Sequence, residues 1–210
     1  MAQLIYILDP MCSWCWGFSP VLQQVRQQAQ AAGVKMTLRV GGLRTGAQAV
    51  LNEKKRAYIL HHWHNVAQAT GQPFNFVQAM PEGFFYDTEP ACRALVVARQ
   101  LNAGLLFPYL DLLQQAFYQE AQDITQPRVL SRLAVQVGYN QDAFSEAFDA
   151  PETQTETQAE FAWVRQLAVN GFPTLLAEDQ QQYALITNGY QSYTVLEPIL
   201  MRWISNHARI

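Results

Sequence analysis

The fold of this sequence is decided at Cys12-Ser13-Trp14-Cys15, which joins an apolar run to a stretch with helical spacing. The run Leu4-Ile5-Tyr6-Ile7-Leu8 lies just before these residues and is typical of a buried strand. Apolar residues at helical spacing follow over residues 15–32. Two cysteines separated by two residues, placed where a strand meets a helix, are typical of a redox centre.

The position of the predicted helix gives the two cysteines different roles. Cys12 would lie at the helix N-terminus, where unpaired backbone N–H groups and the helix dipole favour an anion. These groups stabilise a thiolate, which is the form of cysteine that attacks disulfides. Cys15 would lie one turn deeper, shielded and close enough to attack a mixed disulfide on Cys12. The sequence therefore predicts a nucleophile at Cys12 and a resolving thiol at Cys15.

The composition excludes several classes of function. The chain has 210 residues, half of them hydrophobic, which is enough for one core or two modest ones. A net charge of −3 without long runs of one sign predicts no nucleic-acid surface and no basic membrane-binding face. No segment approaches the roughly 20 apolar residues of a membrane span. The N-terminal residues lack the features of a secretory signal, so we expect a cytoplasmic protein if the chain is complete.

Periodic patterns predict the order of the elements. Strands at 3–8 and 34–40, with the helix at 15–32 between them, predict a βαβ unit whose strands are parallel. From Gly41 to Asn170 the patterns are helical. They place helices at 53–70, 88–102, from Pro108 onward, at 127–137, around 144–148 and at 152–169.

Strand patterns return near the C-terminus. Residues 173–177 and 182–187 predict two strands, with Asp179 in the short connection between them, as in a hairpin. A helix at 194–207 then closes the predicted order. The pattern as a whole predicts an α/β fold in which a helical block interrupts a small sheet.

Three motifs carry a family resemblance. They are Asp-Pro-Met-Cys-Ser-Trp-Cys-Trp-Gly at 9–17, Thr-Glu-Pro-Ala-Cys-Arg-Ala at 88–94 and Gly-Phe-Pro-Thr at 171–174. Together they resemble the DsbA-like thiol–disulfide oxidoreductases, especially the branch without signal peptides, from about residue 4 to residue 204. The resemblance implies a thioredoxin-like domain at 1–42 and 166–210, with a large helical insertion subdomain at 43–165.

The resemblance also implies roles for individual residues. Cys12 is similar to the attacking cysteine of the family, Cys15 to the resolving one and Pro173 to a cis-proline beside the redox pair. Phe172 would then offer its backbone N–H and C=O to an extended substrate segment opposite Cys12. The substrate-binding residues predicted in this way are Trp14, Phe172, Pro173 and Thr174.

The two residues between the cysteines, Ser13 and Trp14, depart from the best-known periplasmic members, which carry histidine in the second of these positions. A histidine there can support the thiolate as a donor or a cation, whereas Trp14 offers an indole N–H and an apolar face. We therefore expect a less oxidising pair than in the strong periplasmic oxidant. Because residues between two such cysteines cap a surface-facing helix end, we also expect Trp14 to be exposed.

Metal binding is an alternative for the cysteine pair. A closed zinc site needs about four ligands, and the sequence holds no second C-x-x-C and no C-x-x-H. His61 and His64 share a helix face, but no cysteine or carboxylate at ligand spacing accompanies them. Cys92 is expected to be a small buried hydrophobe. We therefore predict no metal site and no resident cofactor.

The predicted activity is disulfide exchange, of the protein-disulfide reductase or isomerase type, through a mixed disulfide on Cys12. The expected partners are protein thiols and disulfides, or glutathione as a thiol co-substrate, and a homodimer is compatible with the sequence. Kappa-type glutathione transferases and hydroxychromene-carboxylate isomerases share the implied architecture, with a serine as the attacking residue, and remain an alternative. A redox-sensitive chaperone module is a third reading. Spacing alone places no acid beside Cys15.

Overall fold

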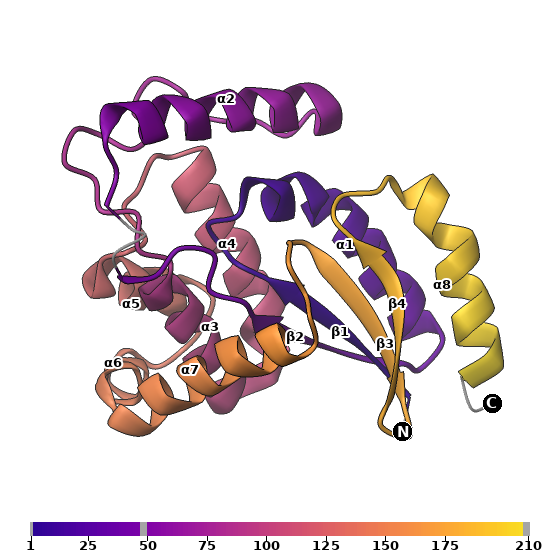
Figure 1. Cartoon of the computed structure of the whole chain (residues 1–210). Helices are drawn as coiled ribbons and strands as arrows, with labels where there is room; N and C mark the ends of the chain where they lie inside the picture. Colours follow the sequence, from indigo (N-terminus) through magenta and orange to yellow (C-terminus); the bar gives the residue numbers. More distant parts are fainter. Residues whose placement is uncertain (1, 47–49, 208–210) are drawn as a thin grey trace.

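A four-stranded mixed sheet lies at the centre of the computed structural model, which describes residues 2–46 and 50–207 (Figure 1). Strand β1 (Gln3–Leu8) pairs in parallel with β2 (Lys35–Val40) and antiparallel with β3 (Thr174–Asp179). Strand β4 (Gln182–Asn188) pairs antiparallel with β3, which gives the order β2-β1-β3-β4. The predicted parallel pairing of the first two strands is confirmed. β1 therefore lies between β2, which follows it closely in the sequence, and β3, which follows it only after the helical patterns of residues 41–170.

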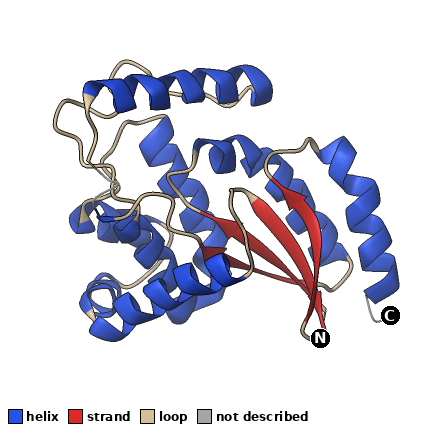
Figure 2. Ribbon diagram, viewed as in Figure 1, coloured by secondary structure: helices blue, strands red, loops and turns tan. Residues whose placement is uncertain are grey.

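Helices cover both faces of this sheet (Figure 2). Side chains of β1 alternate between the faces because a strand has a period of two residues. Tyr6 and Leu8 belong to the main core, which also contains the buried side of α1 (Ser13–Ala31) and of α8 (Tyr193–His207). Ile5 and Ile7 point the other way and pack with α7 in a second cluster. The sheet is therefore the middle layer of three.

A helical block separates β2 from β3 in the chain and lies beside the sheet, with α2 across its top in Figure 1. Its helices are α2 (Glu53–Thr70), α3 (Glu89–Asn102), α4 (Leu106–Tyr118), α5 (Pro127–Gln136), α6 (Gln141–Asp149) and α7 (Pro151–Gln166), with a 3-10 turn at Ala103–Leu105. Within residues 2–46 and 50–207, no helix combines the length and apolarity needed to cross a membrane. The domain boundaries at 42–43 and 165–166 stay a prediction.

Two of the differences from the predicted element boundaries have a clear physical reason. Helix α4 begins at Leu106 instead of Pro108, because proline is tolerated in the first helical turn, where its missing N–H has no partner to lose. Asp179 is the last residue of β3 and not part of the connection. The turn consists of Gln180 and Gln181, with φ values of 50° and 65°. Positive φ at both central residues suits the twist of a two-residue hairpin.

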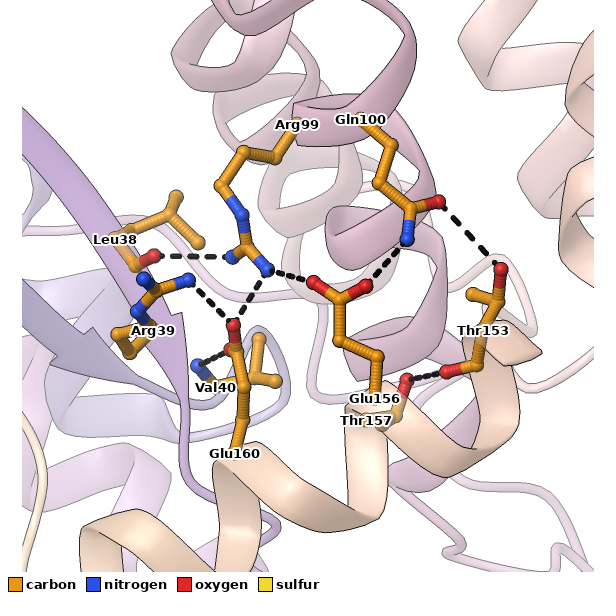
Figure 3. A network of polar contacts seen from close by, with 9 residues as sticks. All are labelled: Leu38, Arg39, Val40, Arg99, Gln100, Thr153, Glu156, Thr157 and Glu160. Atoms are coloured by element: carbon orange, nitrogen blue, oxygen red, sulfur yellow. Dashed lines mark hydrogen bonds and ion pairs between the residues drawn. The ribbon is translucent and has the colours of Figure 1, made fainter.

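A polar network ties the helical block to the sheet (Figure 3). The side chain of Glu160 in α7 is 7% exposed and accepts a hydrogen bond from Arg39 Nη1 of β2 at 2.7 Å. Its other oxygen accepts the Val40 backbone N–H at 3.0 Å. Arg99 of α3 donates to Glu160 and to the carbonyl oxygen of Leu38, the latter at 3.2 Å. One carboxylate therefore joins three elements.

Glu160→Gln is expected to lower the free energy of unfolding by about 3 kcal/mol, because it leaves Arg99 largely buried without its closest counter-charge. Glu156→Gln is the matched control, since Glu156 also binds Arg99 but its side chain is 42% exposed. Exposed ion pairs contribute about 0–1 kcal/mol, so the control should lose little. Urea unfolding of both variants measures the difference, and equal losses would show that burial of Glu160 is irrelevant.

Candidate active site

Cys12 lies at the start of α1, where the chain leaves β1. It is the N-cap residue of the helix, with extended backbone angles of −84° and 116°, and its carbonyl oxygen accepts the N–H groups of Cys15 and Trp16 at 3.0 and 3.1 Å. No side chain caps this helix end and no acidic residue occupies its first turn. The free N–H groups and the positive end of the helix dipole therefore favour an anion at this position.

Cys15 lies one turn further along α1 and is fully buried, whereas Cys12 retains 6% exposure. The cysteines are not bonded to each other. Burial raises the pKa of the Cys15 thiol well above its ordinary value, and the neighbouring Cys12 raises that pKa further. Cys15 therefore keeps its proton in the reduced protein. The structure thus places the second thiol deeper than the first, and the attacking role of Cys12 and the resolving role of Cys15 stay predictions.

The loop before Pro173 faces Cys12 from the other end of the chain. The Phe172–Pro173 peptide bond is cis, and the Cys12 thiol donates to the carbonyl oxygen of Phe172 with an Sγ–O distance of 3.6 Å. The Phe172 ring packs directly on Gly41, where a Cβ atom would lie 1.9 Å from the ring. The absence of a side chain at Gly41 therefore makes room for the Phe172 ring.

Trp14 and Thr174 lie differently from the sequence prediction. Trp14 was expected to be exposed, but it is half-buried because its ring packs on Tyr190, with the ring centroids 5.7 Å apart. The Thr174 hydroxyl is within hydrogen-bond distance of the Gly171 carbonyl oxygen and of Asn188 Oδ1, at 2.8 and 3.1 Å. Thr174 is fully buried, so its side chain supports the loop and offers no surface to a substrate.

Asp9 organises the segment that leads into α1. It is fully buried, and its two carboxylate oxygens accept the backbone N–H groups of Met11 and Leu43 at 2.8 and 2.7 Å. The Cys92 thiol donates to Asp9 Oδ2 at 3.4 Å. Burial raises the pKa of the Asp9 carboxyl, while these donors and Thr88 oppose that rise. Asp9 thus fixes the chain just before Cys12 to the loop that follows β2.

Aromatic side chains surround the buried side of the cysteine pair. Tyr86 is buried and donates its hydroxyl to the carbonyl oxygen of Met11 at 2.6 Å. Phe84 packs against it, whereas Phe85 is 49% exposed. Tyr86 is therefore part of the core, where its hydroxyl holds the loop before Cys12.

The remaining candidates of the sequence analysis lie away from the site or beneath it. Cys92 is buried as predicted, but it also acts as a hydrogen-bond donor to Asp9. His64 is exposed and stacks on Phe76, with centroids 3.9 Å apart. Among the described side chains, no group of three or more His, Cys, Asp or Glu residues is arranged to hold a metal ion.

Asp9 and Tyr86 are the residues of the site that sequence reasoning missed. Asp9 stands three positions before Cys12, and a lone aspartate next to a strand end is an available but weak signal. Its partners Leu43 and Cys92 are 34 and 83 positions away, so spacing could not reveal its role. Tyr86 meets Met11 across 75 positions and carried no signal of this contact.

A cysteine at a helix N-terminus, a buried second cysteine in the next turn and a cis-proline loop beside the first are typical of thiol–disulfide oxidoreductases with an α/β fold. Comparison with known proteins agrees with this class. The family model of the DSBA-like thioredoxin domain matches residues 3–200. The chain therefore belongs to the DsbA-like family and has the predicted thioredoxin-like fold.

Solved structures with this fold include two similar proteins. One, from Nitrosomonas europaea, carries a provisional assignment as a protein disulfide isomerase; it is 42% identical, with 98% of each chain covered and a TM-score of 0.89. The cytosolic disulfide reductase DsbM from Pseudomonas aeruginosa is 28% identical, with 97% of this chain and 99% of that one covered and a TM-score of 0.79. A structure of DsbM with GSH has a TM-score of 0.77 at 25% identity and the same coverage. Among curated proteins, none matches the chain.

Proposed function

We propose that this protein reduces or isomerises disulfides through a mixed disulfide on Cys12. The observation that carries the proposal is the position of the Cys12 thiol, at an uncapped helix N-terminus and 3.6 Å from the carbonyl oxygen of Phe172. The buried thiol of Cys15 lies in the next turn, where it can complete the exchange. Membership of the DsbA-like family supports the same chemistry.

The reaction has two displacement steps. The Cys12 thiolate attacks one sulfur of a substrate disulfide; a bond forms between them, the substrate S–S bond breaks, and the departing sulfur takes up a proton. Cys15 then loses its proton and attacks Cys12 Sγ. The Cys12–Cys15 bond forms, the mixed disulfide breaks, and the second substrate sulfur leaves as a thiol. Two electrons have moved to the substrate, and two molecules of glutathione can return them to the protein.

The proposed substrates are disulfides of proteins or of glutathione. An extended segment would lie against Phe172 and Pro173, where backbone groups are suited to strand-like pairing, with Trp14 beside it. The relative DsbM is called a cytosolic disulfide reductase and was solved with GSH. These two facts support a glutathione-linked reductase in the cytoplasm for the present protein, with glutathione as the thiol co-substrate.

A redox titration tests the proposal. The purified protein is equilibrated in glutathione buffers of defined ratio, and the Cys12–Cys15 disulfide is quantified by thiol alkylation. A midpoint near −270 mV, about the value of thioredoxin, is expected for a protein kept reduced in a cytoplasm. A midpoint near −120 mV, about that of the strong periplasmic oxidant, would overturn the reductase assignment.

The same titration separates the alternatives. If no reversible disulfide forms, disulfide exchange is excluded, and a glutathione-dependent isomerase or transferase becomes the leading assignment. A chaperone module would form the disulfide but would prevent aggregation of an unfolded protein equally well after Cys12→Ser. The proposed enzyme should instead lose insulin-disulfide reduction in that variant.

A further inference from the structure

Tyr6 lies close to the cysteine pair and interacts with both thiols. It is in the middle of β1, is fully buried, and points to the face that α1 covers. Its ring stacks on Phe18 of α1, with centroids 5.9 Å apart and planes inclined by 23°. Phe18 follows Cys15 by three positions, and residues three apart share a helix face. Tyr6 and Cys15 therefore face the same part of the core.

The Tyr6 hydroxyl forms no well-aligned hydrogen bond to the described residues, although it is completely shielded from solvent and lies next to the Cys15 thiol. Buried polar groups are nearly always paired, and leaving one unpaired is unfavourable. A phenylalanine would fill the same space and remove this penalty. An unpaired hydroxyl at this position is free to take a hydrogen-bond partner when the charge of the cysteine pair changes.

A thiolate at Cys15 would give the Tyr6 hydroxyl a hydrogen-bond acceptor. Burial raises the pKa of Tyr6 well above its ordinary value, and negative charge on Cys15 and then on Cys12 raises it further. The phenol thus keeps its proton when Cys15 is a thiolate, and an O–H group can donate to that sulfur. The other titratable groups near Cys15 are Cys12, Asp9 and Tyr118. The carboxyl of Asp9 is already engaged by Met11, Leu43 and Cys92.

We propose that the Tyr6 hydroxyl donates a hydrogen bond to the Cys15 thiolate and so serves as a positioning residue for the resolving step. This inference rests on the proposed disulfide exchange. In that step Cys15 gives up its proton, the Tyr6 O–H turns toward the Cys15 sulfur, and that sulfur displaces the substrate from Cys12. The Cys12–Cys15 bond forms as the Cys12–substrate bond breaks, and the departing substrate sulfur takes up a proton. Tyr6 keeps its own proton throughout.

Tyr6→Phe in a Cys12→Ser background tests the hydrogen bond. The pKa of Cys15, followed by the ultraviolet absorbance of its thiolate, is expected to rise by about one unit relative to Cys12→Ser alone, because a hydrogen bond to a charged group is lost. Phenylalanine keeps the ring and removes only an unpaired oxygen, so the variant should fold, and urea unfolding checks this. An unchanged Cys15 pKa would overturn the proposal.

A kinetic test uses both cysteines. A mixed disulfide of Cys12 with glutathione is held at low pH, where Cys15 is protonated, and glutathione release is followed after a pH jump. Tyr6→Phe should shift the pH profile of release upward by about one unit. At neutral pH, release should slow only about threefold, because a thiolate with a higher pKa is also a stronger nucleophile.

Two matched variants identify the donor. Tyr109→Phe removes a buried hydroxyl that donates to the Leu130 carbonyl oxygen, far from the cysteines in the helical block, and should leave the profile unchanged. Tyr118→Phe removes a second buried, unpaired hydroxyl, and a shift in this variant but not in Tyr6→Phe would overturn the assignment.

If the wild-type protein releases no glutathione, the proposed exchange itself fails. Release with coincident wild-type and Tyr6→Phe profiles would refute Tyr6 alone.

Discussion

Cys12→Ser is expected to abolish disulfide exchange, lowering the rate with a small disulfide substrate at least about a thousandfold, as is typical when a catalytic nucleophile is removed. A serine hydroxyl is not ionised near neutral pH and cannot form the mixed disulfide that the proposed mechanism places on Cys12. Reduction of a chromogenic disulfide by the purified variant, with glutathione as the reductant, measures this loss.

The other two cysteines supply the controls for this experiment. Cys15→Ser should retain the first attack and accumulate the mixed disulfide on Cys12, which mass spectrometry detects as an adduct. Cys92→Ser keeps a donor for Asp9 and should exchange disulfides at nearly the wild-type rate. Loss of exchange in Cys92→Ser, or its survival in Cys12→Ser, would contradict the assignment of the nucleophile.

Asp9→Ala is expected to lower the free energy of unfolding by about 4 kcal/mol. The carboxylate accepts two backbone N–H groups and one thiol in a fully buried position. Removing it leaves the N–H groups of Met11 and Leu43 without an acceptor, and each buried unpaired donor costs about 1–3 kcal/mol. Urea unfolding measures the change. Asp142→Ala, at an exposed position in the first turn of α6, should lose less than about 1 kcal/mol and serves as the control.

Asp9→Asn tests how the free energy of unfolding depends on pH through the same carboxyl group. Burial is the largest cause of the raised pKa of Asp9 in the folded protein, so between the ordinary value of 3.8 and that raised value the folded state binds more protons than the unfolded state. Protonation of Asp9 therefore makes its full contribution to the free energy of unfolding below pH 3.8. This contribution declines as the pH rises through the pKa that Asp9 has in the folded protein. The difference in unfolding free energy between wild type and Asp9→Asn should fall over that window. A difference independent of pH would show that Asp9 titrates alike in both states.

The helices of this protein could be predicted closely because they are amphipathic. Predicted limits of 53–70 for α2 agree with the structure, since Asn52 caps the helix and Gly71 ends it with a φ of 75°. The exposure of Trp14 could not be predicted, because Tyr190 packs on it from a segment 176 positions away. Local periodicity records which face of an element is buried, and it carries no information about which distant side chain covers that face.

The site was predictable only as far as its motifs extend. Cys12, Cys15 and Pro173 stand in recognisable local patterns, and the structure brings the first and the last of them together at the Phe172 carbonyl. Asp9 begins the motif at 9–17 and Tyr6 stands in an apolar run, but neither pattern indicates what their polar atoms contact. Their significance arises from burial and from what their polar atoms do or do not contact, which is a property of the folded core.

The place of β1 in the sheet has a consequence for biosynthesis. β1 and Cys12 emerge early from the ribosome, but Phe172 follows 160 positions later. At about 5–20 residues per second, translation of that interval takes roughly 8–30 s. During this time the nascent chain can pair β1 with β2. The other edge of β1 still lacks β3, and the thiol of Cys12 still lacks Phe172. The surroundings of Cys12 can therefore be completed only after the whole helical block has been made.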